Sequence, residues 1–352
     1  MQRLIDTVAK GTVDRLFGLP RPAVERLFGP PPTNDRGAPL DHQVHVLLSI
    51  MDRIGQPELH EMELAEARNT YHHSTRIFDL APRPMARVED RTIPGPGGPI
   101  PMRLYWPERD SQMPALVFYH GGGFVVGTLD AYDGLCRALA ERLGALVVSV
   151  DYRLAPEAPF PAAIDDSAAA FEWVVQRAEH LGVDPQRVHV GGDSAGGNIS
   201  TVVTQQCVAA GGPTPAGQLL IYPKTDQADG YASRDHFAEG FFLSQGMADW
   251  FGAQYLDGAP INGHRHEDHR VSPIAFDALH DLPPTMVVTA GFDPLRDEGE
   301  AYAARLANAG VDVRHHQQDR LIHGFITQGG VIDAAGRAVA DIAAEYRRGF
   351  LG

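Results

Sequence analysis

A five-residue glycine turn, Gly192-Asp193-Ser194-Ala195-Gly196, constrains the fold of this chain more than any other feature. Before it, Val188 and Val190 are β-branched and predict a short buried strand. After it, an Ala-, Val- and Gln-rich stretch runs to Gly211-Gly212-Pro213, a sequence that ends helices. Ser194 therefore lies at a strand-to-helix corner, where the flanking glycines let the backbone turn tightly and expose its Oγ. A glycine-rich turn with a chance serine gives the same pattern, so the rest of the chain must decide between the two.

Short apolar segments alternate with helical ones from residue 86 onward. Segments 145–150 and 286–289 are continuously apolar, as in strands that are covered on both faces. The alternation predicts an α/β fold with a mostly parallel sheet flanked by helices, whose ligand site lies at the carboxyl ends of the strands. The expected strands are 86–92, 102–106, 115–119, 145–150, 187–191, 218–222, 285–290 and 311–317, and the expected helices are 131–143, 160–180, 195–210, 299–309 and 333–349.

Two segments lie outside this alternation. Residues 1–85 show helical spacing only, as at Val44, Leu47 and Met51. Residues 224–273 separate two strands by about fifty positions, which is too long for a plain crossover. We expect the N-terminal segment 1–85 and the insertion 224–273 to form a helical cap over an α/β domain of residues 86–352.

A run of glycines, His120-Gly121-Gly122-Gly123-Phe124, follows the expected strand 115–119. Consecutive glycines leave the backbone bare, so main-chain N–H groups can point at a developing negative charge. The N–H groups of Gly122 and Gly123, together with that of Ala195, are the expected oxyanion hole. The alternatives are a flexible loop or a phosphate cradle, but a phosphate-binding sequence such as G-K-[ST] is absent from this stretch.

Two further chemical groups follow expected strands. Asp293 comes directly after the strand 285–290, and His323 comes shortly after the last strand, before a glycine that permits an irregular loop. The order Ser194, Asp293, His323 is that of a nucleophile, an acid and a base. A neutral imidazole can take the serine proton, and a fixed carboxylate can hold the imidazolium that forms. The acids at 297 and 298 are expected to open the next helix.

These motifs together resemble the hormone-sensitive-lipase-like branch of the α/β-hydrolases, a family of carboxylesterases. The resemblance extends from about residue 40 to the C-terminus and includes the 151–157 stretch, Asp151-Tyr152-Arg153-Leu154-Ala155-Pro156-Glu157. It implies an eight-stranded, largely parallel sheet with a helical cap, and hydrolysis of short- to medium-chain acyl esters without a cofactor. It also implies that Arg153 and Glu157 pin a loop near the site. Lactones and activated amides are alternative substrates, and a non-catalytic binding module is the alternative outside catalysis.

The substrate pocket is expected to form under the cap. Phe241, Phe242 and Leu243 of the insertion, with Phe124 of the glycine run, would cover Ser194 with apolar side chains. Such a pocket favours acyl chains of modest length. Residues 1–38 extend beyond the usual start of the family and leave the shape of the cap open.

Charge and residue usage limit the partners. The net charge is −15, and the chain has no block of lysines or arginines, so neither nucleic acid nor a membrane surface is expected as a partner. No apolar run approaches the roughly eighteen residues of a membrane span. Only Cys136 and Cys207 occur, which favours a reducing, cytoplasmic location. The expected partner is a small-molecule ester. A homodimer is allowed by the sequence but does not follow from it.

A metal site is the alternative for the polar stretch that contains His264, His266 and His269. These histidines lie in an expected loop without helical i, i+4 spacing, and an arginine lies among them. We therefore expect a solvated loop and no metal.

Overall fold

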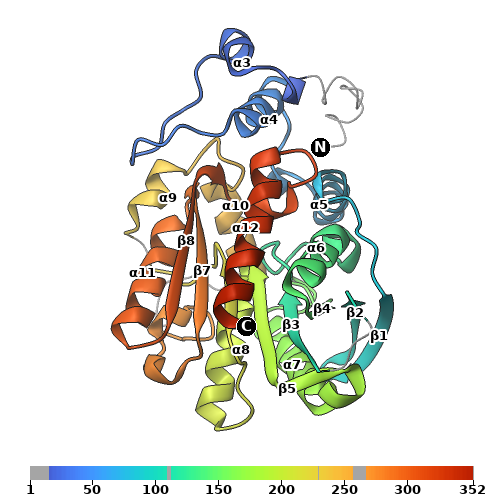
Figure 1. Cartoon of the computed structure of the whole chain (residues 1–352). Coiled ribbons are helices and arrows are strands. Elements are labelled where there is room, and N and C mark those ends of the chain that lie inside the picture. Colours follow the sequence, from blue (N-terminus) through green and yellow to red (C-terminus); the bar gives the residue numbers. More distant parts are fainter. Residues whose placement is uncertain (1–15, 109–111, 229, 257–266, 352) are drawn as a thin grey trace.

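The structure is a computed structural model that describes residues 16–108, 112–228, 230–256 and 267–351. One eight-stranded sheet in the order β1-β2-β4-β3-β5-β6-β7-β8 forms its centre (Figure 1). Strands β3 to β8 are parallel, whereas β2 is antiparallel to β1 and β4, so the predicted mostly parallel sheet is confirmed. The strands are β1 (Arg87–Gly95), β2 (Gly98–Trp106), β3 (Met113–Tyr119), β4 (Leu146–Val150), β5 (Val183–Asp193), β6 (Gln218–Ile221), β7 (Thr285–Phe292) and β8 (Val313–Ile322).

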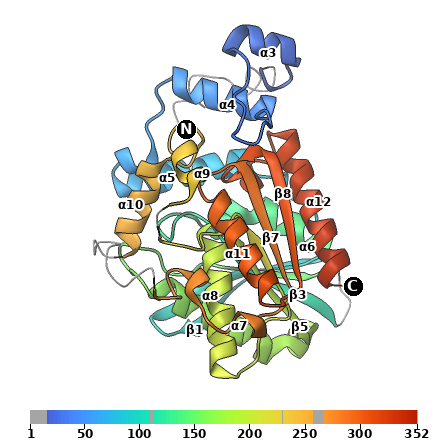
Figure 2. The ribbon, with the colours of Figure 1, turned by 90° about the vertical axis from the view of Figure 1, so that its left-hand side faces the viewer.

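Helices cover both faces of the sheet (Figure 2). Successive residues of β3 alternate between two cores: Leu116 and Phe118 pack with α6 and α12, whereas Val117 and Tyr119 pack with α7 and α8. Because both faces are covered, all of β3 is buried and its sequence is continuously apolar. The flanking helices are α6 (Asp133–Leu143), α7 (Ala162–Leu181), α8 (Ala195–Ala210), α11 (Arg296–Asn308) and α12 (Asp333–Phe350).

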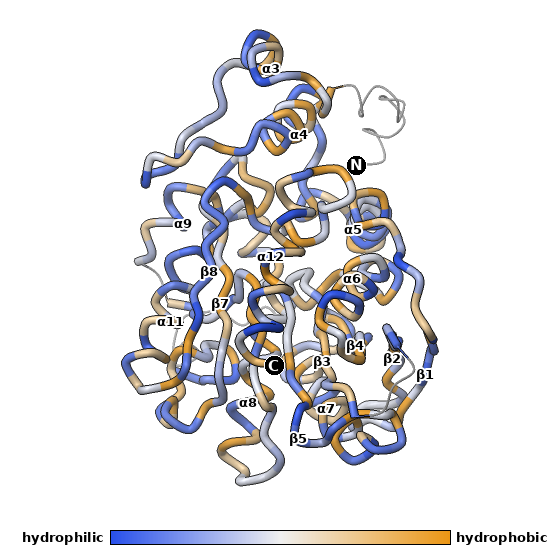
Figure 3. The backbone as a smooth tube through the Cα atoms, viewed as in Figure 1, coloured by the Kyte–Doolittle hydropathy of each residue, from blue (hydrophilic) through white to orange (hydrophobic). Residues whose placement is uncertain are grey.

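The two edge strands differ from the central ones in polarity. Strands β1 and β8 carry many hydrophilic residues, whereas apolar residues concentrate in the central strands (Figure 3). Charged and polar side chains on edge strands oppose pairing with another chain. The polar run His315-His316-Gln317-Gln318 hides the strand signal, and β8 continues to Ile322, beyond the predicted end at 317.

The described parts of the N-terminal segment and of the insertion lie over the carboxyl ends of the strands (Figure 1). The two segments touch one another, since the Ser244 hydroxyl donates to the Glu58 carboxylate. The N-terminal segment is also tied to the sheet: the Asn34 amide donates to the carbonyls of Gly291 and Asp319, each at 3.2 Å. Their described helices are α3 (Arg21–Phe28), α4 (His42–Arg53), η1 (Leu59–Glu61), α5 (Leu64–Phe78), α9 (Ala232–His236) and α10 (Gln245–Tyr255). Further short helices among the described residues are η2 (Leu129–Tyr132), η4 (Pro273–Ala275), η5 (Leu279–Asp281) and η6 (Phe325–Thr327).

Candidate active site

Ser194 occupies the corner between β5 and α8, with φ 55° and ψ −115°. A residue other than glycine at positive φ is strained, and such strain persists only where the surroundings fix the backbone. Glycine is needed on both sides, because a Cβ on Gly192 would lie 2.3 Å from the Tyr119 carbonyl oxygen and one on Gly196 1.8 Å from it. The close approach of β3 to this turn therefore holds the serine at the end of the sheet.

Ser194, Asp293 and His323 meet at the carboxyl ends of β5, β7 and β8. His323 Nε2 lies 2.9 Å from Ser194 Oγ, and His323 Nδ1 lies 2.8 Å from Asp293 Oδ2. Asp293 is fully buried, and its other carboxylate oxygen accepts a hydrogen bond from the Leu295 N–H at 2.8 Å. The Tyr222 ring centroid lies 4.6 Å from that of the imidazole. In this arrangement a neutral imidazole can accept the serine proton while the carboxylate holds its Nδ1–H.

The glycine loop after β3 lines the same cavity as Ser194. Gly122 and Gly123 have φ values of 114° and 59°, and a Cβ on Gly122 would lie 2.2 Å from the Val126 carbonyl oxygen. Within the described part of the chain, the N–H groups of Gly122, Gly123 and Ala195 donate to no protein acceptor. These three donors are thus available to an oxygen that becomes negatively charged.

Two buried titratable side chains support the glycine loop. The Asp193 carboxylate accepts the Gly121 N–H at 2.8 Å and the hydroxyls of Tyr132 and Tyr222 at 3.2 and 3.5 Å. Burial raises the pKa of Asp193 to about 6. His120 Nδ1 lies 2.7 Å from the Gly121 carbonyl oxygen, to which it donates. Burial lowers the pKa of His120 to about 4, so this imidazole is neutral near pH 7.

The cavity beside Ser194 has a volume of about 1240 Å³. Phe124 lines it and stacks on Tyr255 of α10, with 3.7 Å between the ring centroids. Phe241, Phe242 and Leu243 line it as well, as do residues of α4, α5 and α10. The four side chains predicted for the pocket therefore share one cavity with Ser194 and His323. Further apolar lining comes from Leu40, Leu48, Met51, Tyr71, Phe78, Met247, Phe251 and Leu295.

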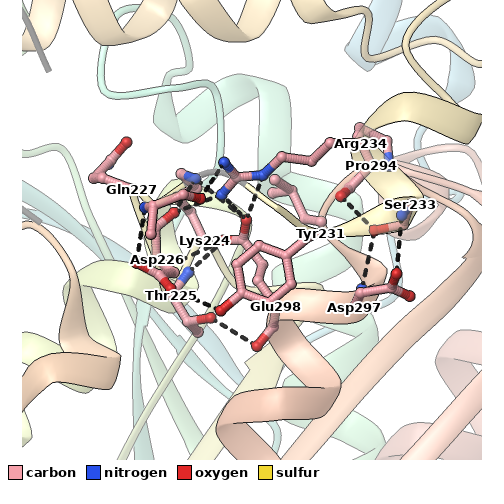
Figure 4. A network of polar contacts seen from close by, with 12 residues as sticks. Lys224, Thr225, Asp226, Gln227, Tyr231, Ser233, Arg234, Pro294, Asp297 and Glu298 are labelled. Atoms are coloured by element: carbon pink, nitrogen blue, oxygen red, sulfur yellow. Dashed lines mark hydrogen bonds and ion pairs between the residues drawn. The ribbon is translucent and has the colours of Figure 1, made fainter. Parts of the chain in front are cut away.

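A partly buried cluster of charged side chains borders this cavity (Figure 4). Lys224 follows β6, and its backbone N–H donates to the Ser194 carbonyl at 3.2 Å. Its ammonium lies 3.3 Å from the carboxylate of Glu298, which is fully buried and also contacts the Arg234 guanidinium. Burial lowers the pKa of Lys224, and the neighbouring Glu298 opposes this shift. Asp297 and Glu298 lie in the first turn of α11, as predicted. The sequence did not predict that Glu298 is buried.

One signal could have indicated this charged cluster. Lys224 stands only three positions after the apolar strand β6, where a parallel sheet places its ligand site. The partners Arg234 and Glu298 lie 10 and 74 positions farther along the chain, and no spacing rule connects them.

The stretch 151–157 makes ion pairs near the site. The Arg153 guanidinium binds the Asp166 carboxylate through two contacts of 2.8 Å. Glu157 binds Arg68 of α5 through two contacts of 2.7 Å, and Arg68 also donates to the Val125 carbonyl at 3.0 Å. Arg68 therefore connects the N-terminal segment to the loop that carries the glycine run.

The histidine-rich stretch gives no metal site in the part of the chain that the structure covers. Residues 264 and 266 lie outside the described residues, and His269 contacts the Phe276 ring at 5.2 Å between centroids. No three His, Cys, Asp or Glu side chains among the described residues are grouped to hold a metal ion.

None of the helices in the described residues is both long enough and apolar enough to cross a membrane.

Known proteins resemble this chain in sequence. The family described as having the alpha/beta hydrolase fold matches residues 116–327. The carboxylic ester hydrolase LipN of Mycobacterium tuberculosis is 41% identical over 332 residues, which cover 92% of this chain and 87% of LipN. The carboxylesterase NlhH of the same organism is 44% identical over 268 residues, which cover 75% of this chain and 83% of NlhH.

Solved structures resemble it in fold. The ester hydrolase EH1AB1 from the metagenome of Lake Arreo has a TM-score of 0.84 at 41% identity, covering 88% of this chain and 99% of its own. The hyperthermophilic esterase of Pyrobaculum calidifontis has a TM-score of 0.81 at 38% identity, covering 87% and 98%.

Proposed function

Because the chain belongs to the hormone-sensitive-lipase-like carboxylesterases of the α/β-hydrolase fold, we propose that it hydrolyses short- to medium-chain acyl esters through an acyl-enzyme. Ser194 is the nucleophile, His323 is the general base and then the general acid, and Asp293 holds the imidazole. The observation that carries this proposal is the continuous hydrogen-bonded chain from Ser194 Oγ through His323 to Asp293, with distances of 2.9 and 2.8 Å, on the wall of an apolar cavity.

The proposed reaction has two halves. Ser194 Oγ attacks the ester carbonyl carbon while His323 Nε2 takes the hydroxyl proton, and the carbonyl oxygen becomes an oxyanion. The N–H groups of Gly122, Gly123 and Ala195 donate to this oxyanion. His323 then gives the proton to the departing alcohol, which leaves an acyl ester on Ser194. Water, deprotonated by the same imidazole, attacks the acyl carbon, and the imidazolium returns this proton to Ser194 Oγ as the acyl–oxygen bond breaks and the acid leaves.

The cavity supports a preference for apolar acyl chains of modest length. Phe124, Phe241, Phe242 and Leu243 line it, and each buried methylene contributes about 0.8 kcal/mol, or roughly fourfold in kcat/KM. We expect kcat/KM to rise from acetate to a maximum between butanoate and octanoate and then to fall, because longer chains must displace Phe241, Phe242 and Leu243.

We also propose that segments 1–85 and 224–273 form the cap of a catalytic domain of residues 86–352, and that the enzyme works in the cytoplasm. The helices of both segments contribute to the cavity lining. Cys136 and Cys207 are free thiols, as suits a reducing compartment.

The test is a set of p-nitrophenyl esters from acetate to palmitate. Ser194→Ala should lose several orders of magnitude in kcat with an unchanged circular dichroism spectrum, and an organophosphate should label Ser194 in the wild type. His323→Ala should lose activity, whereas His316→Ala, whose imidazole binds Glu345, should keep it. Full activity of Ser194→Ala would show that another nucleophile acts.

A further inference from the structure

The carboxylate of Asp193 takes no part in the reaction proposed above, although it directly precedes Ser194. The side chain is 3% exposed, and its Oδ1 accepts the Gly121 N–H at 2.8 Å. Contact with the loop is close, since a Cβ on Gly121 would lie 2.5 Å from Asp193 Oδ2. One residue thus connects the turn that carries the nucleophile to the loop that carries two of the proposed oxyanion donors.

The Gly121 residue is held on both of its peptide groups. Asp193 binds its N–H, and the His120 imidazole binds its carbonyl oxygen at 2.7 Å. In a planar trans peptide the carbonyl and the following N–H point in opposite directions. The bond to His120 therefore turns the Gly122 N–H away from His120, and this N–H lacks an acceptor among the described residues.

A chain of hydroxyls continues from Asp193 to helix α5, which lines the cavity. The Tyr132 hydroxyl donates to Asp193 Oδ2 at 3.2 Å, and the Tyr71 hydroxyl lies 3.0 Å from that of Tyr132. Since the Tyr132 proton is directed at the carboxylate, Tyr71 is the donor in the second bond. Tyr132 is fully buried in η2, whereas Tyr71 belongs to α5 and lines the cavity. Hydrogen bonds in such a chain polarise one another, and the last one is charge-assisted.

We propose that Asp193 is a positioning residue of ester hydrolysis, and that the chain Tyr71–Tyr132–Asp193 makes the geometry of the glycine loop depend on the docking of α5. The inference rests on the proposed roles of Ser194 and Gly122. Loss of the chain misplaces N–H groups that act on the oxyanion, so it lowers kcat and leaves ground-state binding nearly unchanged. Helix α5, which lines the pocket, then affects the rate of reaction as well as the choice of substrate.

Conservative removal of the hydroxyls tests the proposal. Tyr132→Phe and Tyr71→Phe are compared with Tyr346→Phe, which removes a buried hydroxyl that lies 2.9 Å from His189 Nδ1, between α12 and β5. With p-nitrophenyl butanoate we expect Tyr132→Phe to lower kcat about tenfold with KM within about twofold of wild type, and Tyr346→Phe to keep kcat within about twofold. Because the two hydroxyls act as one unit, the double variant Tyr71→Phe/Tyr132→Phe should have a kcat similar to that of Tyr132→Phe.

Replacement of Asp193 gives a second test of the proposal. Asp193→Asn keeps an oxygen for the Gly121 N–H and should retain at least about ten times the kcat of Asp193→Ala. A kcat of Tyr132→Phe equal to that of wild type, or equal falls in Tyr132→Phe and Tyr346→Phe, would overturn the inference. Multiplicative losses in the double variant would overturn the coupling to α5. Each of these outcomes is compatible with an inactive Ser194→Ala, so the proposed function and this inference fail separately.

Discussion

Removal of one buried charge tests the cluster that joins the insertion to α11. In Glu298→Gln the side chain keeps its size, and its oxygen can still accept the N–H groups of Thr225 and Asp226, now at 2.8 and 3.2 Å. The amide group, however, replaces the oxygen that contacts the Arg234 guanidinium and lies 3.3 Å from the Lys224 ammonium. Two cations then lose the anion that they share.

The expected cost is large because Glu298 is fully buried. Removing one partner of a buried ion pair costs about 3–5 kcal/mol in the free energy of unfolding. The matched control is Glu300→Gln, two residues farther along α11. Glu300 pairs with Arg36, whose side chain is 38% exposed, and exposed ion pairs contribute about 0–1 kcal/mol. We therefore expect Glu298→Gln to be less stable than Glu300→Gln by about 3 kcal/mol.

Equilibrium unfolding in urea at pH 7, followed by tryptophan fluorescence, measures both variants and the wild type. Refolded samples must regain the starting signal and activity. If the free energies of unfolding of the two variants lie within about 1 kcal/mol of each other, the carboxylate of Glu298 contributes no more to stability than that of Glu300. The explanation from loss of a buried carboxylate that two cations share would then be wrong.

Three further outcomes are expected. Gly127→Ala should lower kcat for p-nitrophenyl butanoate, since φ is 116° and the new Cβ would lie 2.2 Å from His120 Nδ1; an unchanged kcat would show that the ring can shift freely. Burial raises the pKa of Asp79 to about 7, so the folded state binds the extra proton and stability falls as pH rises from about 4 to 7. Asp79→Asn should remove this part of the fall, and urea midpoints at pH 5 and 8 will measure it. Deletion of residues 1–38 removes Asp35, whose carboxylate lies 2.6 Å from the Arg296 guanidinium. The truncated protein should unfold at lower urea and show a flatter acyl-length profile, with organophosphate labelling retained.

The parts of the fold that sequence could predict are those encoded by local signals. Continuous apolar runs mark the central strands, and the glycines beside Ser194 mark a turn that other residues cannot make. The edge strand β8 was predicted too short because its polar residues have no apolar alternation to reveal them. Its end at Ile322 depends on pairing with β7, which is a property of the sheet.

The same distinction applies to the candidate site. Ser194, Asp293 and His323 each follow a strand, so their convergence could be inferred from topology alone, and their roles stay predictions until they are tested. The link from Asp193 through Tyr132 to α5 could not be inferred, because a tyrosine in a helical pattern indicates core packing equally well. Long-range hydrogen bonds of this kind are set by how elements dock, and sequence spacing carries no record of them.

The attachment of the N-terminal segment has a consequence for how the chain folds during its synthesis. Asn34 donates to Gly291, 257 positions later, and Asp35 binds Arg296, 261 positions later. At about 5–20 residues per second, the ribosome completes those partners about 13–52 s after the N-terminal segment has been made. Helix α4, whose buried face includes Val44 and Leu47, must keep that apolar face out of wrong contacts throughout this interval. A ribosome-bound chaperone that covers this helix early would therefore raise the yield of active enzyme more than one that acts on the finished chain.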